Sequence, residues 1–386
     1  MFSSRGPADR DPNSFTRALE KARARGQHLL DLTVSNPTHC GFDGDGQRLG
    51  QVLSNPAAAR YDPDPRGLRT AREAVLGLWA ERGISSTADR VLLTSSTSEA
   101  YGWLFKLLCD PGDEVLAPRP SYPLFDLLAS FEAVALRPYP LRYDGGWHID
   151  LGALRAAITS RTRAVLVVSP NNPTGSYLTK RELGALAELG IPIVCDEVFA
   201  DYPLRDVPDR VRSVLDQPTG LVFALDGLSK LAALPQLKLG WITVGGSPAL
   251  AQEAVSRLEL IADSYLSVGT PVQLAAPRLL AERHAIQRAI TERLRTNLGT
   301  LRSTLRGSAA TVLDVQGGWY AVMRLPAVAT EMQWVLGLLE DGVVVQPGWF
   351  FDFETEPFVV ISLLTPVDDC RAAAEVIAAR VARCCG

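Results

Sequence analysis

Short apolar segments recur along the chain, and several of them end in a polar or charged motif. The clearest lie at 91–93, 115–117, 164–168, 191–195 and 221–225. Each has the pattern of a buried strand, and segments with a helical pattern lie between them. Strands that alternate with helices predict an open α/β sheet, and such a sheet binds its ligand in the crevice outside the carboxyl ends of its strands.

The size and charge of the chain exclude several functional classes. Its 386 residues suffice for two domains, and an apolar fraction of 47% provides a core. The net charge is −4 and there is no basic cluster, so nucleic acid is not an expected partner. The longest apolar runs fall far short of the roughly 20 residues of a membrane helix. Met1–Arg10 lacks the apolar core of a signal peptide, so we expect a cytoplasmic protein.

Neither the histidines nor the cysteines have the spacing of a metal site. The histidines are His28, His39, His148 and His284. The cysteines are Cys40, Cys109, Cys195, Cys370, Cys384 and Cys385. Because no Cys-x-x-C pair or clustered histidine motif occurs among them, we expect no metal centre. Buried or free thiols are favoured over disulfides, in agreement with a cytoplasmic location.

The first part of the chain has weak secondary-structure patterns. Residues 13–27 are charged and Ala-rich, which is typical of an amphipathic helix, and 29–34 form a short strand candidate. Residues 41–56 are rich in Gly, Asp and Asn, so irregular structure is expected there.

The last part of the chain predicts a second domain. Long helical patterns cover 249–262 and 273–302, and short strands and helices alternate after them. We therefore predict a large α/β domain over 40–270 and a discontinuous small α+β domain formed by 1–39 and 271–386.

A lysine follows the apolar segment 221–225. Lys230 lies at the centre of Gly227–Gly240, a stretch in which Pro235 and Gly240 exclude one continuous helix. Small apolar neighbours disfavour the ammonium, and an amine that loses its proton can form a Schiff base with a carbonyl cofactor. A lysine beside a strand can also be a solvated surface charge.

Three further motifs combine polar side chains with the ends of apolar segments. Ser96 and Thr97 belong to a hydroxyl-rich turn before a helix, which suits a phosphate but is also typical of a helix N-cap. Asn171–Gly175, with the sequence Asn-Asn-Pro-Thr-Gly, can be a simple turn. Asp196 ends a buried strand, where an acid is costly unless it has a partner.

These motifs, in this order, resemble those of the class I/II aminotransferases, the pyridoxal-phosphate enzymes of fold type I. The resemblance covers roughly residues 29–364. It implies a large domain with a mostly parallel central sheet flanked by helices, a smaller α+β domain, and pyridoxal 5′-phosphate bound to Lys230. It also implies a homodimer with the active site at the subunit interface.

The resemblance assigns five residues to the cofactor phosphate. Ser96 and Thr97 would bind it at the helix N-terminus. Gly227 and Lys238 match the other two phosphate positions of the family, but Gly227 brings no hydroxyl, so Ser229 would serve instead. Lys238 replaces the usual Arg with a point charge that can still pair with phosphate.

Four more residues are implied to contact other parts of the cofactor or the partner subunit. Tyr122 would stack on the pyridine ring. Asn172 would donate a hydrogen bond to the phenolic oxygen, and Asp196 would keep the ring nitrogen protonated. Tyr61, in a Tyr-x-Pro-x-x-Gly motif, would reach across the dimer interface to the partner's cofactor phosphate; without the resemblance it would be a packing residue in a rigid turn.

The implied reaction moves an amino group from an amino acid or amine to a keto acid or other carbonyl acceptor. Lys230 would hold the cofactor as an internal aldimine, give way to the donor amine, and move the α-proton by way of a quinonoid to yield pyridoxamine phosphate. Relatives with the same cofactor site catalyse β-elimination, decarboxylation, racemisation or ring closure, and these reactions remain alternatives. A non-catalytic regulator is the least favoured alternative, because the short N-terminus leaves no room for a helix-turn-helix.

Phe199 departs from the family pattern. Relatives usually have a Tyr here, which donates a second hydrogen bond to the phenolic oxygen of the cofactor. Hydrogen bonds to this charged oxygen favour the unprotonated aldimine, so we expect the internal aldimine to be a stronger base here than in typical relatives. Tyr202 is an alternative source of the missing donor.

Val360 is a second departure. It replaces the Arg with which the family binds the substrate α-carboxylate, and no Lys or Arg occurs between Arg324 and Arg371. Either another group binds the carboxylate, such as Asn36, Arg119, Arg324 or backbone amides, or the substrate has no α-carboxylate.

Aromatic residues occupy the segments that match the loops around the family's substrate pocket. They are Trp319, Tyr320, Trp349, Phe350, Phe351 and Phe353. They could equally belong to the core of the small domain. If several line the site, an apolar or aromatic substrate side chain is favoured. Of these, Trp319, Tyr320 and Trp349 are the candidate substrate contacts, together with Asn36.

Overall fold

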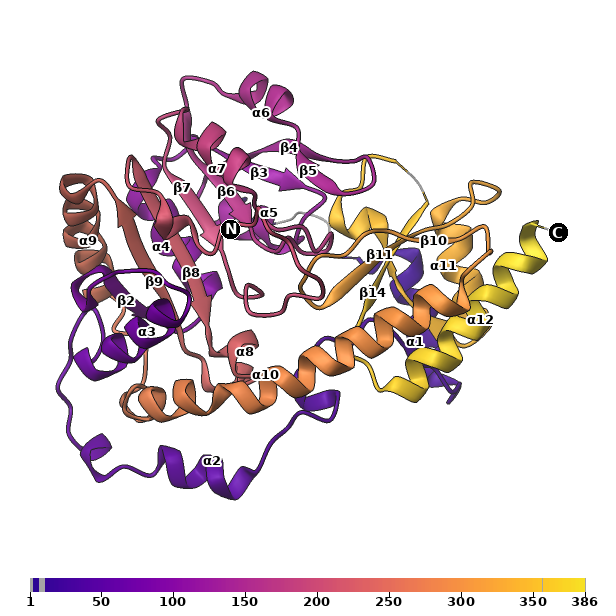
Figure 1. Ribbon diagram of the computed structural model, residues 1–386, viewed down its shortest axis with the longest axis horizontal. Helices are drawn as coiled ribbons and strands as arrows, with labels where there is room; N and C mark the ends of the chain where they lie inside the picture. Colours follow the sequence, from indigo (N-terminus) through magenta and orange to yellow (C-terminus); the bar gives the residue numbers. More distant parts are fainter. Residues whose placement is uncertain (1–2, 7–10, 356, 386) are drawn as a thin grey trace.

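The computed structural model describes residues 3–6, 11–355 and 357–385, and helices surround a large β-sheet, a small β-sheet and a separate pair of short strands (Figure 1). The large sheet has eight strands in the order β2-β9-β8-β7-β6-β3-β4-β5. Neighbours from β8 to β4 run parallel, whereas β9 is antiparallel to both of its neighbours and β5 is antiparallel to β4. The mostly parallel α/β sheet predicted from the sequence is therefore confirmed. Its strands are β2 (Val91–Thr94), β3 (Glu114–Arg119), β4 (Ala135–Tyr143), β5 (Trp147–Ile149), β6 (Thr162–Val168), β7 (Ile193–Asp196), β8 (Leu221–Gly227) and β9 (Gly240–Gly246).

The central strands are apolar throughout because both faces of the sheet are covered. In β6, Val165 and Val167 pack in one core cluster and Leu166 packs in the other. The cluster of Leu166 includes α4, α5 and α9, and the other includes α3, α7 and α10. The helices are α3 (Arg69–Glu81), α4 (Thr97–Leu108), α5 (Leu124–Phe131), α6 (Leu151–Ala157), α7 (Lys180–Ala187), α9 (Pro248–Asp263) and α10 (Thr270–Thr304).

The small sheet is antiparallel and has the order β10-β11-β14-β13. The strand β1, near the N-terminus, pairs in parallel with β12, so this early segment joins the last part of the chain. Helix α1 packs on α11, and α12 lies against α10 (Figure 1). The elements are α1 (Ser14–Ala24), β1 (Leu30–Asp31), β10 (Thr311–Val312), β11 (Tyr320–Arg324), α11 (Glu331–Glu340), β12 (Val343–Val344), β13 (Gln346–Pro347), β14 (Phe358–Ser362) and α12 (Val367–Cys385).

Helix α10 connects the two sheets. It extends from beneath the large sheet to α12 (Figure 1). Near its middle, the amide of Gln287 donates a hydrogen bond to the carbonyl of Leu231 (3.0 Å). Ten residues later, the amide of Asn297 donates to the carbonyls of Leu363 (2.9 Å) and Thr365 (2.8 Å), just beyond β14.

The prediction of irregular structure over 41–56 is wrong. Helix α2 (Gly46–Leu53) lies in this segment. The carboxylate of Asp45 accepts hydrogen bonds from the backbone N–H groups of Gln47 (2.9 Å) and Arg48 (3.2 Å), so the Asp that suggested a loop is the N-cap. An ion pair between Arg48 and Glu282 (3.0 Å) attaches α2 to α10.

The remaining elements are short. They are α8 (Leu228–Leu231) and the 3-10 helices η1 (Pro37–His39), η2 (Pro56–Ala59), η3 (Ala88–Arg90), η4 (Val214–Asp216), η5 (Pro235–Leu237) and η6 (Gly348–Phe351). Within residues 3–6, 11–355 and 357–385, no helix combines the length and apolar character needed to cross a membrane. The six cysteines are free thiols.

Two leucines of α9 test how much this core contributes to stability. Leu258 is fully buried, whereas Leu250 on the same helix is 50% exposed. We expect Leu258→Ala to lower the free energy of unfolding by about 2 to 5 kcal/mol, because it removes buried methyl groups and leaves a cavity. Leu250→Ala is the matched control and is expected to cost less than about 1 kcal/mol. Urea denaturation measures both, and equal losses would contradict the assignment of this face of α9 to the core.

Candidate active site

The carboxyl ends of β7 and β8 bring an acid and a lysine to the same edge of the large sheet. β7 ends at Asp196, and β8 ends at Gly227. Helix α8 begins at the next residue and carries Lys230. Because the strands are parallel neighbours with Asp196 opposite Leu225, both ends lie on one side of the sheet.

The two charged groups influence each other's protonation. Burial lowers the pKa of the Lys230 amine, and the negative charge of Asp196 partly offsets this effect. Burial also raises the pKa of Asp196 to about 6, although the N–H of Val198 (3.1 Å), the hydroxyl of Tyr101 (3.3 Å) and the charge of Lys230 all oppose this rise. At neutral pH the carboxylate is mostly ionised, and the amine loses its proton more readily than an exposed lysine does.

Aromatic rings surround the Lys230 amine. Its Nζ lies 5.0 Å from the ring centroid of Trp319 and 5.8 Å from that of Phe199. The Phe199 ring in turn lies 5.3 Å from Trp319 and 6.2 Å from Tyr320. The hydroxyl of Tyr202 donates to the carbonyl oxygen of Lys230 (2.6 Å), which fixes the backbone of α8.

The hydroxyl-rich turn lies at the N-terminus of α4. Ser96 is the N-cap, and its hydroxyl accepts a hydrogen bond from the N–H of Glu99 (3.2 Å), while Thr97 is the first residue of the helix. The carboxylate of Glu99 accepts hydrogen bonds from the N–H of Ser95 (2.7 Å) and the hydroxyl of Ser267 (2.7 Å). The N-cap interpretation of Ser96 is therefore correct, and it is compatible with an anion at the same helix end.

Gly240 brings this turn close to the lysine turn. Strand pairing sets Gly240 opposite both Thr94 and Gly227. A Cβ on Gly227 would lie 2.9 Å from the carbonyl oxygen of Leu239 and 3.0 Å from Cα of Gly240, so the close approach of the two strands requires glycine. Lys238, two residues before β9, is exposed and has a left-handed backbone with φ 51°.

Asn172, Tyr122 and Ser229 complete the set of residues near the strand ends. Asn172 is buried, and its side-chain oxygen has no hydrogen-bond partner in the described part of the chain. Tyr122 is 42% exposed, and its pKa is raised by burial and by the charge of Asp196. Ser229 is partly buried within α8, one residue before Lys230.

Comparison with known proteins identifies the family. The family model described as aminotransferase class I and II matches residues 27–377. The chain belongs to this family. The glutamate–pyruvate aminotransferase AlaA of Escherichia coli is 28% identical over 368 residues, which cover 92% of this chain and 90% of that protein.

Solved aminotransferase structures share the whole fold. An aminotransferase from Escherichia coli has a TM-score of 0.87 at 26% identity and covers 99% of this chain and 98% of its own. A double mutant of the aspartate aminotransferase from Thermus thermophilus has a TM-score of 0.85 at 26% identity and covers 99% of each chain. The chain is therefore an aminotransferase of fold type I that uses pyridoxal phosphate. These predictions from the sequence are confirmed, and transamination is favoured over the other reactions left open there.

The residues of this aminotransferase fit pyridoxal phosphate. The Lys230 amine has a lowered pKa, which suits condensation with an aldehyde. The buried carboxylate of Asp196 suits a protonated ring nitrogen, and the amide of Asn172 has an N–H donor that suits a charged oxygen on the ring. The N-terminus of α4, with Ser96 and Thr97, suits a phosphate.

Three of the candidate residues have other contacts or are exposed. The side-chain oxygen of Asn36 accepts hydrogen bonds from the N–H (3.2 Å) and hydroxyl (2.9 Å) of Thr38, so it caps η1. Trp349 packs against the ring of Phe350 at 5.1 Å. Tyr61 is 77% exposed. None of these three has a contact with Lys230 among the interactions of the described residues.

The structure narrows the choice of carboxylate-binding groups around Val360. Val360 is fully buried and pairs with Val322 and Gln346 in the small sheet. Arg324 lies at the opposite end of β11 from Tyr320, which excludes it as a ligand near Lys230. Arg119 remains at the end of β3, where it forms ion pairs with Asp126 (3.4 Å) and Asp352 (3.5 Å).

Sequence reasoning missed Tyr101 and Glu99 at this site, and it considered a different role for Tyr202. Tyr101 donates to Asp196 across 95 residues of sequence, and Glu99 connects the hydroxyl-rich turn to Ser267. Tyr202 holds the carbonyl of Lys230, so its hydroxyl does not supply the donor that Phe199 lacks. In the sequence, the only indication that Tyr202 belongs to the site is its position six residues after Asp196.

The close packing at Gly227 gives a testable prediction. Gly227→Ala is expected to destabilise the protein by about 1 to 3 kcal/mol, because the new Cβ must push apart β8 and β9. The displaced turn should also lower the occupancy of the Lys230 Schiff base, measured by visible absorbance. Gly299→Ala is the control: a Cβ there meets nothing within 4 Å in α10, and the change is expected to stabilise by up to about 1 kcal/mol. Equal thermal stability of the two variants would contradict the packing argument.

Proposed function

We propose that Lys230 and Asp196 are the working pair of an aminotransferase that moves an amino group from an amino acid to a keto acid. The observation that carries this proposal is the Lys230 amine, whose pKa is lowered by burial beside the carboxylate of Asp196. A lysine of this kind can bind an aldehyde and can serve as a base near neutral pH. A solvated surface lysine does neither efficiently.

Each residue of the site has a proposed task. Pyridoxal phosphate, when bound, supplies an aldehyde that condenses with amines and a ring that stabilises the electron pair left at the substrate α-carbon. The Lys230 Nζ would take the proton from that carbon and deliver it to the carbon of the cofactor that carried the aldehyde, so that the amino group stays on the cofactor. The Asp196 carboxylate holds a proton at the ring nitrogen, and the hydroxyl of Tyr101 orients this carboxylate. Asn172 and Tyr122 orient the ring.

Residues at the ends of β2, β8 and β9 would hold the cofactor phosphate. Ser96 and Thr97 offer the N-terminus of α4, and Ser229 offers a hydroxyl from α8. Lys238 offers a positive charge from the turn before β9. Gly227 contributes by its small size, because it lets this turn approach β8.

The relatives' printed names support an amino-acid donor and a keto-acid acceptor. The similar protein from Escherichia coli is a glutamate–pyruvate aminotransferase. Since Val360 is aliphatic, we propose that another group binds the substrate carboxylate, either Arg119 at the end of β3 or a neutral donor. The buried Nε1 of Trp319, beside Lys230, has no partner among the described residues and is the first such donor. Phe199 and Tyr320 favour an apolar side chain on the substrate.

A homodimer is proposed on the strength of Tyr61 and Ser267. These residues line the same surface cleft, and Ser267 is hydrogen-bonded to Glu99 beside the phosphate turn. An exposed Tyr at this place is suited to contact a second subunit. We further propose a large domain over 40–270, a small domain formed by 1–39 and 271–386, and a cytoplasmic location that agrees with six free thiols.

The first experiment is a half-reaction screen. Purified holoenzyme is mixed with single amino acids and with the matching amines that lack the carboxylate, without acceptor, and the visible absorbance of the cofactor is followed. We expect loss of this absorbance together with formation of a keto acid, and faster conversion for amino acids with apolar side chains.

Lys230→Ala is the control for the screen, and it should lose both the lysine-bound absorbance and the conversion. Conversion of amines alone would contradict the amino-acid assignment. If product is released while the visible absorbance of the lysine-bound cofactor is unchanged, transamination is contradicted. Elimination or ring closure would then be favoured.

Phe199 gives a spectroscopic prediction. In Phe199→Tyr, a new hydroxyl near Lys230 can donate to the charged phenolic oxygen of the cofactor, which favours the unprotonated Schiff base. We expect the midpoint of the pH titration of the visible absorbance to fall by about one pH unit. Phe199→Leu removes the ring without adding a donor and should not lower the midpoint. A titration of Phe199→Tyr that matches the wild type would refute the role of this position.

A further inference from the structure

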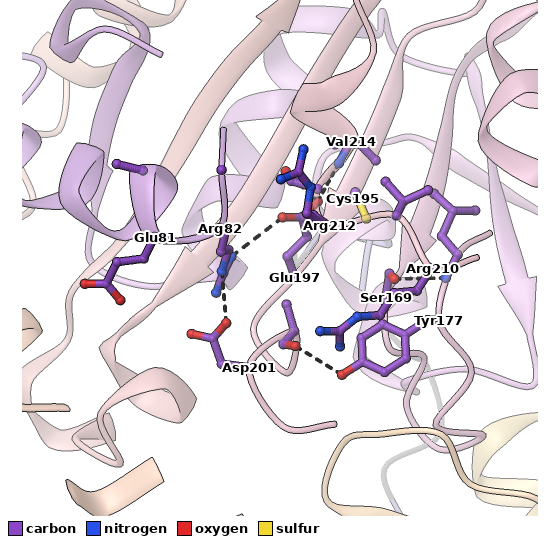
Figure 2. Close-up of a pocket in the computed structure, with 16 residues that line it drawn as sticks. Glu81, Arg82, Ser169, Tyr177, Cys195, Glu197, Asp201, Arg210, Arg212 and Val214 are labelled. Atoms are coloured by element: carbon purple, nitrogen blue, oxygen red, sulfur yellow. Dashed lines mark hydrogen bonds and ion pairs between the residues drawn. The ribbon is translucent and has the colours of Figure 1, made fainter. Parts of the chain in front are cut away.

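A cleft of 440 Å³ lies beside the active site and is lined by charged side chains that the proposed function does not use (Figure 2). Arg82, Glu197 and Asp201 project toward one another in its wall (Figure 2). Together with Asp226 they form the group that we name the Arg82 cluster. It contains one guanidinium and three carboxylates, and all of its side chains are buried except that of Asp201, which is 22% exposed.

Arg82 pairs with all three carboxylates. It directly follows α3 and is the C-cap residue of that helix. Its Nε donates to Oδ1 of Asp201 (3.0 Å), and its Nη2 donates to Oδ2 of Asp226 (2.9 Å). Its Nη1 lies 3.8 Å from Oε2 of Glu197. The three carboxylates come from separate segments of the chain, so one side chain connects all of them.

Each carboxylate adjoins a residue of the active site. Glu197 directly follows Asp196 at the end of β7. Asp226 precedes Gly227 at the end of β8, four residues before Lys230.

Asp201 makes the third connection. It precedes Tyr202, whose hydroxyl holds the carbonyl of Lys230. The amide of Gln287, which donates to the carbonyl of Leu231, also donates to Asp201 (3.2 Å). The segments that carry Asp196 and Lys230 therefore contact the same guanidinium.

Burial makes this arrangement specific for arginine. The side chains of Arg82, Glu197 and Asp226 are 9%, 2% and 0% exposed. Buried carboxylates that lose their cation are strongly destabilised, so the three segments cannot move apart from Arg82 at low cost. A guanidinium offers donors in several fixed directions, whereas an ammonium is a point charge that cannot serve three separate carboxylates with the same geometry.

The surrounding charges do not replace Arg82. Burial raises the pKa of Glu197 and that of Asp226 to about 7, and in both cases the charge of Arg82 opposes this rise. Arg283 faces Asp201 from α10, but it is also paired with Glu81.

Other groups near the cluster have different partners. His284 lies 3.3 Å from Glu81, Arg212 pairs with Asp216, and Arg210 lies over the ring of Tyr177. Arg82 is thus the only cation that forms an ion pair with Asp226 or Glu197 among the described residues.

We propose that Arg82 is a positioning residue for amino transfer: by holding Glu197, Asp201 and Asp226 it fixes the Lys230 amine relative to the Asp196 carboxylate. The proposal rests on the proposed roles of Lys230 and Asp196. Its consequence is that a change at Arg82 alters the ionisation of the lysine–cofactor unit and the rate of proton transfer, in addition to stability. A purely structural arginine would affect stability alone.

The test replaces Arg82 with lysine, which keeps the charge and loses the planar fork. In Arg82→Lys holoenzyme we expect kcat to fall at least about tenfold while KM for the amino donor changes less than about threefold, because the loss is in positioning at the reacting atoms. We also expect the midpoint of the pH titration of the visible absorbance to move by at least about 0.5 pH unit.

Arg72→Lys is the matched control. Arg72 lies on α3, the helix that ends before Arg82; its side chain is 4% exposed, and it pairs with Asp64 (3.1 Å) and with the carbonyls of Gly67 and Ala88 (both 2.8 Å). None of these partners adjoins Asp196 or Lys230 in the sequence. The control should lower the melting temperature and leave the titration midpoint unchanged. A midpoint in Arg82→Lys equal to that of the wild type would overturn the proposal, whatever the loss of stability.

A second variant covers the case in which Arg82→Lys does not fold. Asp201→Asn keeps the shape of the side chain, removes one ion pair, and is expected to lower kcat about tenfold and to move the titration midpoint. An unchanged kcat and midpoint would overturn the proposal. Lys230→Ala distinguishes failure of the Arg82 proposal from failure of the proposed function. If Lys230→Ala keeps the lysine-bound absorbance, the role of Lys230 is refuted, and the role of Arg82 is refuted with it.

Discussion

The register of the parallel strands β6, β7 and β8 decides where the polar groups of the site lie. Val168 is opposite Asp196, and Asp196 is opposite Leu225, so three strand ends stop at nearly the same level. Both faces of these strands are covered, and a shift of one residue would turn Asp196 toward the opposite face of the sheet. Burial along each whole strand therefore fixes the register, and the register fixes the positions of the polar groups in the site.

Features that depend on neighbours in the sequence could be predicted. The apolar segments gave the strands, and the small residues around Lys230 indicated an amine with few water contacts. The pairing of Ser96 with a helix start was also visible, because N-caps depend on residues within one turn. The wrong prediction of irregular structure at α2 also comes from reasoning on local sequence. Asp45 is typical both of a loop and of an N-cap, and composition alone does not distinguish the two.

Features that depend on distant contacts could not be predicted. Tyr101 meets Asp196 across 95 residues, and Arg82 meets Asp226 across 144. In the sequence, Arg82 is a charged residue at the end of an amphipathic helix, where a solvated side chain is the common outcome. Only the packing of α3 against the sheet brings its guanidinium among the three carboxylates.

Helix α10 gives the two sheets a mechanical connection. Gln287 is bonded to the backbone beside Lys230, and Asn297 is bonded to the backbone beyond β14. The ten residues between them span about 15 Å of regular helix, which resists compression and bending. The same stretch of helix therefore sets the spacing between the backbone next to Lys230 and the backbone that follows β14, like a spacer of fixed length.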